Sequence, residues 1–399
     1  MKLAKLSLAA IVVAGLATSS FAADTLVDAF KNGKLTGEIK AFYFDRDTGD
    51  AVASFGKGDA SLFANGLMLN YVTDSLMGFK FGATFQSSNA PFADDDAKLA
   101  FAKDMYGTGA QLSEAYLAYS AGKTTITAGR MFISSPLVAS SGSRIVKDAF
   151  EGATIINTDL PGTTIGFGYV DKWQPRTDYT LGGAANAGNI AKFRPVGDGA
   201  YTVFAINKSI SGLMLSGAWA GAQDFSVANG DIDLYRFEAK YEGKASNFSY
   251  NLGGQYFITE YSGVTPDSNG FALKAGIGVS SIDAYVAYSK ISDEGKVKYG
   301  FGFGADTLYT QSPIISDNYE PDTEAYAIDI AYKFTKDAKI GIDYLVTEDP
   351  VRGDLSYSAI YGSYAFDGVL KGLSVLAQYE EEGKDGNDKE FRFKANYKF

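Results

Sequence analysis

The feature that most constrains this chain is an alternation of apolar and polar residues with a period of two. It recurs from residue 34 to the last residue, and in one typical segment Tyr235 and Phe237 alternate with Arg236 and Glu238. In a β-strand, such alternation places the two sets on opposite faces of a sheet. Because the same pattern continues to the end of the chain, we expect one β-domain rather than several.

The alternation predicts eighteen strands separated by short turns and longer polar loops in turn. They are expected at residues 34–45, 61–73, 78–88, 111–120, 123–132, 149–158, 163–172, 199–208, 212–222, 231–241, 246–258, 270–279, 281–290, 323–335, 339–347, 355–366, 372–381 and 389–399. An even number of such segments, with short turns on one side, predicts an all-β fold: a transmembrane antiparallel β-barrel. Lipid offers the backbone no hydrogen bonds, so a sheet in a membrane must close on itself.

The alternative fold is a soluble β-sandwich, propeller or β-helix, whose strands also alternate. Two features favour the membrane barrel. Soluble strands average about 5 to 6 residues, which is shorter than most of these segments. Tyr and Phe also gather at the strand ends, where the aromatic girdles of membrane barrels lie.

The first 22 residues predict a cleaved signal peptide. Lys2 and Lys5 precede an apolar run at 6–17, and Ala22 is a small residue suited to the cleavage position. The run is shorter than the about 20 residues that a spanning helix needs. Residues 23–33 are then a short periplasmic N-terminal segment, and 34–399 the barrel domain.

Composition excludes most enzyme classes. The chain has no cysteine and no histidine, which excludes disulfides, thiolate or imidazole metal sites and histidine-dependent catalysis. Acidic residues outnumber basic residues by 47 to 36, so no electrostatic footprint for nucleic acid exists. We expect no catalytic residue, no cofactor and no enzyme activity. Asp94, Asp95 and Asp96 lack the ligand spacing of a calcium loop, and Ca²⁺ binding there is left open.

The final segment alternates without exception and ends on the aromatic residue Phe399. Such an ending is typical of strands that the barrel-assembly machinery of the bacterial outer membrane recognises. We therefore expect Phe399 to act as an assembly signal, and the protein to be integral to that membrane.

Several segments resemble the OprD-type family of outer-membrane porins. The matching residues are Gly37 to Asp47, Gly66 to Phe85, Gly129 to Leu137, Ser143 to Val146 and Phe150 to Gly152. The resemblance implies an 18-stranded passive porin whose third long loop, 133–148, folds into the pore. The sequence lacks a recognisable counterpart of the dense arginine ladder that better-known members have for small carboxylates. Monomer and homotrimer both remain open.

The loop 133–148 is thus the candidate pore constriction. Its apolar residues could pack on the inner wall, and the alternative is a solvated surface loop. The predicted constriction residues are Arg144, Lys147 and Asp148 in the loop and Arg130, Glu114 and Glu38 on the facing wall.

Strand alternation also predicts which charges line the lumen, because a charge on the lipid face costs about 2–4 kcal/mol at the midplane. These residues are Lys40, Lys80, Arg236, Glu238, Lys240, Lys274, Asp329, Lys333, Asp343, Glu380, Arg392 and Lys394. This lining is mixed in sign. The acidic excess lies in the loops at the mouth, which predicts a weak preference for cations.

The expected function is passive diffusion of small hydrophilic solutes and ions through a water-filled channel. The alternative is an adhesin or receptor barrel that acts through its long extracellular loops. Its binding surface would be the loop 291–322, with Phe301, Phe303, Tyr309, Ile314 and Tyr319.

Overall fold

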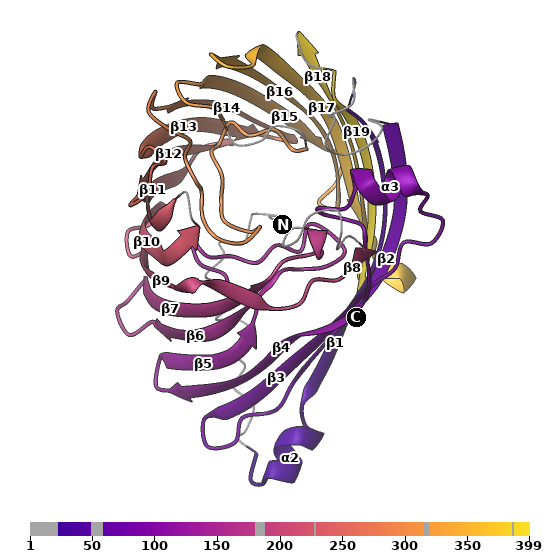
Figure 1. The fold of residues 1–399 in the computed structure, drawn as a ribbon, viewed down its shortest axis with the longest axis vertical. Coiled ribbons are helices and arrows are strands. Elements are labelled where there is room, and N and C mark those ends of the chain that lie inside the picture. Colours follow the sequence, from indigo (N-terminus) through magenta and orange to yellow (C-terminus); the bar gives the residue numbers. More distant parts are fainter. Residues whose placement is uncertain (1–22, 49–58, 180–187, 227–228, 315–318, 385–386) are drawn as a thin grey trace.

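The computed structural model describes residues 23–48, 59–179, 188–226, 229–314, 319–384 and 387–399. Its strands form one sheet that curls into a closed barrel (Figure 1). The strands are β1 (Lys34–Asp47), β2 (Asp59–Val72), β3 (Phe79–Ser88), β4 (Gly107–Ala121), β5 (Thr124–Met131), β6 (Ala149–Asn157), β7 (Thr163–Gln174), β8 (Gly188–Asn189), β9 (Arg194–Asn207), β10 (Leu213–Ser226), β11 (Gly230–Ala245), β12 (Phe248–Tyr261), β13 (Ser268–Val279), β14 (Ile282–Ile291), β15 (Glu324–Lys333), β16 (Ala338–Asp349), β17 (Gly353–Ala365), β18 (Leu373–Lys384) and β19 (Lys389–Lys398). The signal peptide predicted for residues 1–22 lies outside the described residues.

The first and last strands close the barrel. β1 pairs with β19 in antiparallel register, from Glu38 opposite Lys398 to Asp47 opposite Lys389. β8 has two residues and pairs in parallel with the start of β4, within a loop. The other eighteen strands form the wall, so the predicted antiparallel barrel and its strand count are confirmed.

Strand boundaries differ from the prediction mainly at turns. Residues 242–245 were expected to form a turn, but β11 continues to Ala245, and Glu242 lies opposite Asn251. The chain reverses instead at Ser246 and Asn247, where Ser246 has a φ of 54°. A two-residue hairpin turn of this hand matches the twist of its strands, so the ladder can extend to its end.

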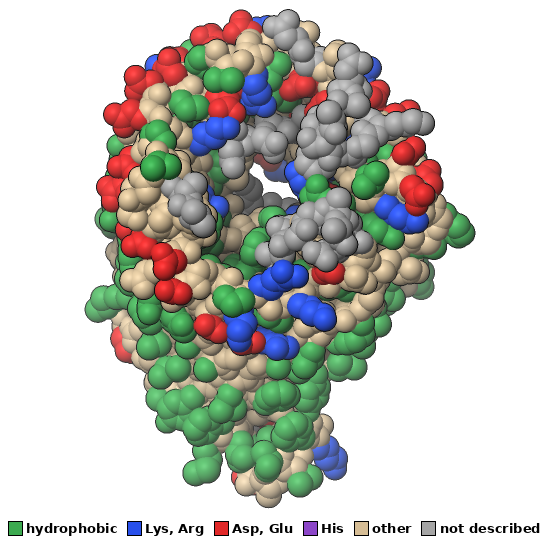
Figure 2. Space-filling view, viewed as in Figure 1, with side chains coloured by type: hydrophobic (Ala, Val, Ile, Leu, Met, Phe, Trp, Pro, Cys, Tyr) green, Lys and Arg blue, Asp and Glu red, His purple; other side chains and the backbone are tan. Residues whose placement is uncertain are grey.

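The outer face is apolar, with aromatic pairs near the short turns. Phe79 lies 4.6 Å from Tyr119 and Tyr397 lies 5.9 Å from Phe399, measured between ring centroids. Figure 2 shows hydrophobic side chains over the lower outer wall. This arrangement fits a lipid-facing band that ends in an aromatic girdle at the periplasmic side.

Some aromatic side chains of the strands point inward. Phe42 and Phe44 point into the barrel and are fully buried, and the ring of Phe101 packs edge-on against Phe44 at 6.4 Å. These inner rings are covered by loops that enter the lumen. Among the described residues, three short helices accompany the strands: α2 (Leu26–Lys31), α3 (Asp95–Ala100) and η2 (Gly368–Leu370). In the described part of the chain, no helix is long and apolar enough to span a membrane.

Two of the loops that fold into the lumen lie against each other. We call residues 132–148 the inner loop, and residues 292–314 with 319–323 the long loop; Figure 1 shows the long loop, in orange, reaching across the barrel. The two loops pair through their backbones: Ala139 N–H donates to the carbonyl of Phe301 at 3.0 Å, and Phe301 N–H donates to the carbonyl of Leu137 at 2.7 Å. An opening remains beside them (Figure 2).

A closed ladder leaves no strand edge from which detergent can begin to separate the strands. We therefore expect heat-modifiable migration: an unboiled sample in SDS should run at a different position from a boiled one. The measurement is gel electrophoresis on protein shown by circular dichroism to be folded. Identical migration of the two samples would contradict the closed barrel.

The backbone of Phe399 is bonded across the seam between the two ends of the barrel sheet, and its ring belongs to the aromatic girdle. Its carbonyl accepts from Gly37 N–H at 2.8 Å, and its own N–H donates to the Gly37 carbonyl at 3.0 Å. Deleting Phe399 should lower the amount of inserted barrel severalfold while synthesis and export continue, because the residue is predicted to be both assembly signal and interfacial anchor. Membrane fractionation measures this, and the Phe399→Tyr variant, which keeps the aromatic ring, is the control. If the deletion variant inserts in unchanged amounts, Phe399 is only an ordinary lipid-facing residue.

Candidate functional site

The inner loop is attached to the barrel wall by a buried lysine. Lys40 in β1 is almost fully buried on the inner face. Its ammonium group donates to the carbonyls of Gly142 at 3.3 Å, Arg144 at 3.0 Å and Ile145 at 3.3 Å. Since an ammonium has three donors, these bonds satisfy it completely. The loop therefore lies inside the barrel, as the family resemblance implied.

A second attachment comes from β3. The Gln86 side chain donates to the carbonyl of Lys147 at 2.8 Å and accepts from the N–H of Lys147 at 2.9 Å. The Lys147 ammonium then lies 4.2 Å from the centre of the Phe132 ring. Burial lowers the pKa of this lysine. Gln86 thus fixes the backbone of the residue that was predicted to carry charge at the constriction.

Asp148 joins three separate segments. Its buried carboxylate accepts from Ser141 N–H at 2.7 Å, from Trp173 Nε1–H at 3.2 Å and from Phe303 N–H at 3.1 Å. Burial raises the pKa of Asp148, and these donors oppose the shift. The aspartate therefore holds the inner loop, β7 and the long loop together.

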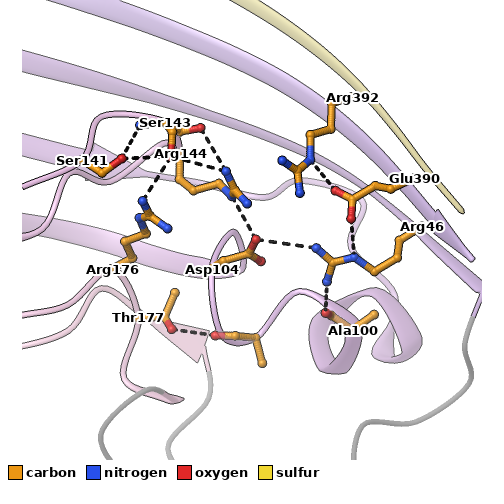
Figure 3. A network of polar contacts seen from close by, with 11 residues as sticks. Arg46, Ala100, Asp104, Ser141, Ser143, Arg144, Arg176, Thr177, Glu390 and Arg392 are labelled. Atoms are coloured by element: carbon orange, nitrogen blue, oxygen red, sulfur yellow. Dashed lines mark hydrogen bonds and ion pairs between the residues drawn. The ribbon is translucent and has the colours of Figure 1, made fainter. Parts of the chain in front are cut away.

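Arg144 belongs to a network of ion pairs at the barrel seam (Figure 3). Its Nε lies 2.9 Å from the Asp104 carboxylate, which also lies 3.6 Å from Arg46. Glu390 in β19 then pairs with Arg46 at 2.8 Å and with Arg392 at 2.5 Å. The network links the loop after α3, the inner loop, β1 and β19.

Basic side chains are in excess around this network. Arg176 donates to the Ser143 hydroxyl at 3.2 Å, and its guanidinium lies 4.2 Å from the Phe303 ring centre. Burial lowers the pKa of Arg176 to about 10. Arg144, Arg176 and Arg392 also act electrostatically on Lys394 in β19. The basic residues of this region come from several segments of the chain. They are Arg46, Arg144, Arg176, Arg392, Lys394 and Lys40, and we call them the basic wall.

A second charged cluster lies on β11. Glu238 pairs with Arg236 at 3.2 Å and with Lys240 at 2.8 Å, and it accepts from the Tyr309 hydroxyl at 2.8 Å. Arg236 also pairs with Asp306 of the long loop at 3.2 Å. These contacts hold the long loop against the inner face of the wall.

Carboxylates on β15, β16 and β18 make up a further part of the lining. Glu380 is buried and accepts from Ile314 N–H at 2.8 Å and from the Ser312 hydroxyl. The structure thus places this predicted lumen residue beneath the long loop. Asp329 accepts from the Tyr361 hydroxyl at 2.7 Å, and Asp343 from the Tyr285 hydroxyl at 3.5 Å.

The predicted wall residues of the constriction do not all come together. Glu114 accepts from Phe132 N–H at 2.8 Å, beside the inner loop, and Glu38 lies 3.8 Å from Lys40. Arg130 lies elsewhere: it pairs with Glu151 at 2.9 Å and shares the face of Ile126, an exposed outer residue. Strand alternation therefore directs Arg130 away from the lumen, and its expected place at the constriction was wrong.

The other predicted lumen charges have inner-face positions in their strands. The Lys274 ammonium lies 3.3 Å from the Tyr285 ring centre, and Lys333 pairs with Asp283. Lys80 shares the inner face of β3 with the buried Thr84 and Gln86.

An apolar cavity of about 390 Å³ lies beside the two loops. Aromatic side chains of Phe150, Trp173 and Phe225 line it from the wall, and Phe301 lines it from the long loop. The Lys298 ammonium, another part of the lining, lies 5.4 Å from the Phe225 ring centre. Burial lowers the pKa of this lysine.

Comparison with known families decides the identity of this fold. The family model for the outer membrane porin, OprD family, matches residues 28–399. The chain belongs to the OprD family. As an OprD-family porin it resides in the outer membrane, where it contacts lipid, and the resemblance seen in the sequence is confirmed.

Solved porins share the fold of this OprD-family chain at low sequence identity. Pseudomonas aeruginosa OccK9 (OpdG) superposes with a TM-score of 0.77 at 10% identity, covering 93% of this chain and 99% of that chain. P. aeruginosa OccK8 (OprE) gives 0.75 at 15% identity, with 93% and 99% covered. Acinetobacter baumannii OccAB3 gives 0.75 at 14% identity, with 92% and 99% covered. A comparison with curated protein sequences gave no match.

Within the described residues of this porin, no group of three or more acidic side chains is arranged to hold a metal ion. Asp94 instead caps α3 by accepting from Ala97 N–H at 2.8 Å. Asp95 pairs with Lys98 at 2.9 Å on the exposed side of the same helix. Two of the three aspartates considered for Ca²⁺ thus have ordinary helix-end roles.

Several residues of the site were missed from the sequence. Arg46 continues the inner-face alternation of β1, but the predicted strand ended at residue 45. Asp104 and Arg176 are in loops, where no periodicity indicates direction. Their positions depend on partners more than thirty residues away along the chain.

Asp104 is the shared partner of Arg46 and Arg144, and its substitution tests the network. Burial by itself would raise the pKa of Asp104, but the guanidinium groups of Arg144 and Arg46 outweigh it and hold the pKa below its usual value. The ion pairs are therefore present above about pH 4 and weaken only as the carboxylate becomes protonated at lower pH.

Asp104→Asn should free the inner loop near the seam and destabilise its packing by about 3 kcal/mol, because the buried Arg144 guanidinium loses its carboxylate and Arg46 keeps only Glu390. Single-channel recordings at pH 7 should show noisier currents with additional conductance levels. Asp95→Asn is the matched control, since its exposed pair with Lys98 contributes little. If the current traces of Asp104→Asn do not differ from those of the wild type, the ion-pair network does not hold the inner loop in place.

Proposed function

We propose that this OprD-family porin forms a water-filled channel for passive diffusion of small hydrophilic solutes and ions. The observation that carries the proposal is the opening left beside the inner loop and the long loop (Figure 2). An 18-stranded barrel is too wide for side chains alone to fill, so loops must set the passage. Diffusion through such a passage needs no energy source and no tight binding site.

The proposed constriction is the space bounded by the inner loop and the long loop. Its charged lining would include Arg144, Lys147 and Asp148, with Glu114 and Glu38 on the adjoining wall. The basic wall supports a local preference for anions, because its four arginines, Arg46, Arg144, Arg176 and Arg392, outnumber their two acidic partners, Asp104 and Glu390. A solute would meet this field at short range, where added salt screens it weakly.

The charge at the mouth of the barrel is opposite in sign to that of the basic wall. In Figure 2, acidic side chains gather along the upper rim of the opening and basic side chains along the lower edge. Acidic loop residues include Asp94, Asp293 and Glu294, all of them exposed. Mouth charge acts through solvent and supports a weak cation preference at low ionic strength.

The alternative, an adhesin or receptor barrel, has less support. It relied on the long loop as an exterior surface, yet Phe301 and Tyr319 are buried within the barrel. The Tyr319 hydroxyl donates to the Thr310 carbonyl at 2.9 Å inside the same loop. Side chains buried in this way are not available to a receptor.

Planar bilayer recording distinguishes the two functions. Stepwise, ohmic currents from purified barrel support the porin channel. A folded barrel, heat-modifiable on gels but electrically silent, would contradict the channel and favour the adhesin.

Homotrimer formation is a separate proposal. A groove of about 380 Å³ crosses the outer face between Ile342, Tyr344 and Ile360, and a neighbouring barrel could cover it. Native mass spectrometry of detergent-extracted protein would count the subunits.

The charge arrangement predicts how selectivity depends on salt. Wild type should prefer cations weakly at low ionic strength and less so as salt rises. Arg144→Ala together with Lys147→Ala should strengthen the cation preference at high salt, because two cations near the passage are lost. Reversal potentials across a KCl gradient, at two mean concentrations, measure both effects.

The control for this variant is Lys123→Ala, which removes a cation from a periplasmic turn and should change nothing. Unaltered selectivity in the double variant would show that the inner loop does not form the constriction. Anion preference of the wild type at both concentrations would show that the lumen, rather than the mouth, governs permeation.

A further inference from the structure

Helix α2 stands on the lipid-facing side of the barrel wall. The ring of Phe30 lies 6.5 Å from Tyr71 and 6.4 Å from Phe81, measured between centroids. Phe81 alternates in phase with Phe79 and Phe85, which are exposed on the outer face. The helix therefore packs against residues of the lipid-facing band, at the end of the barrel where the short turns lie (Figure 1).

Backbone hydrogen bonds fix α2 in this position. Ala23 N–H donates to the Ser75 carbonyl at 2.7 Å, and Asp74 N–H donates to the Ala29 carbonyl at 2.9 Å. Thr25 caps the helix by accepting from Asp28 N–H at 3.1 Å. The attachment to the turn between β2 and β3 thus depends on these backbone contacts, on the buried Ala29 and on one side of the Phe30 ring, and it leaves Leu26, Val27 and half of Phe30 exposed.

Those side chains form one exposed face. Leu26 is 63% exposed, Val27 74% and Phe30 49%. Phe30 lies three residues after Val27 and four after Leu26, and both spacings place side chains on the same side of a helix. Met77, in the adjoining turn, is 83% exposed. A contiguous apolar patch of this kind marks an interaction surface.

We propose that α2 inserts this apolar face into the periplasmic leaflet of the outer membrane and extends the lipid-facing band below the barrel. The partner is lipid, because the patch is continuous with a surface already in contact with lipid through Tyr71 and Phe81. Figure 2 shows hydrophobic side chains continuing from the outer wall toward the lower tip of the molecule, where α2 lies.

The charges around the patch fit an interfacial position. Lys31 and Lys34 flank it and are exposed; long basic side chains can lie along apolar surface while their ammonium groups reach the headgroups. Asp28 lies on the side of the helix away from Leu26 and Phe30. The segment expected to be simply periplasmic is thus amphipathic, with its apolar side toward the bilayer.

Site-directed spin labelling tests the proposal, because the chain has no native cysteine. A nitroxide on Val27→Cys in proteoliposomes would report collisions with oxygen, which concentrates in lipid, and with a water-soluble nickel chelate. Leu117→Cys, exposed on the outer face of β4, is the lipid reference. Lys123→Cys, exposed in a periplasmic turn, is the aqueous reference.

We expect the oxygen-to-nickel collision ratio at residue 27 to be severalfold above that at residue 123 and to approach that at residue 117. A ratio equal to that at residue 123 would overturn the proposal, since the helix would then lie in water. Low collision rates with both reagents, or spin–spin broadening between labels, would also overturn it, because a protein or a second copy would cover the face. Val27 is exposed, so its substitution leaves folding intact, and channel conductance, recorded on the same samples, tests the porin function separately.

Discussion

Pairing of β1 with β19 is the interaction on which the rest of this structure depends. Within lipid, every backbone N–H and C=O must find a partner inside the protein, and only a closed ladder provides this for a sheet. The seam satisfies the requirement along ten residue pairs, from Glu38 opposite Lys398 to Asp47 opposite Lys389. Closure with eighteen strands also fixes a wide lumen, and the width creates the space that the loops then occupy.

The loops are held inside this lumen by two kinds of contact. Apolar clusters form where inner-face rings such as Phe44 meet loop residues such as Phe101. Buried polar side chains then fix the backbone: Lys40 binds three carbonyls of the inner loop, and Asp148 accepts from three segments. Because a buried ionised group is costly unless its hydrogen bonds are satisfied, such residues specify one loop position rather than many.

Basic and acidic side chains occupy different parts of the lumen, although their signs are mixed along the sequence. The basic wall combines residues from β1, β19, the inner loop and the loop after β7, whereas Asp329, Asp343 and Glu380 lie on β15, β16 and β18. In the proposed channel, a solute would meet fields of opposite sign on different sides. Acidic residues at the mouth would add a longer-range field that salt screens. The proposed selectivity thus combines two fields that respond differently to ionic strength.

The sequence alone determined the barrel, its strand count and the direction of most wall side chains. Period-two alternation, as in Tyr235 to Glu238, is a local property of an extended backbone and needs no distant contact to be recognised. The same alternation applies to Arg46 and Arg130. Arg46 was missed because the predicted strand ended at residue 45, and Arg130 was assigned to the lumen although its strand position faces outward. The family resemblance added the inward path of the inner loop.

Only the tertiary structure decided which charges meet. Arg144, Arg176, Asp104 and Arg392 are far apart in the sequence, and three of them lie in loops, where no periodicity fixes direction. Their proximity follows from closure of the barrel at β1 and β19 and from the entry of loops into the lumen. A loop position results from many weak long-range contacts rather than from a local pattern, so the basic wall became visible only when those contacts were in place.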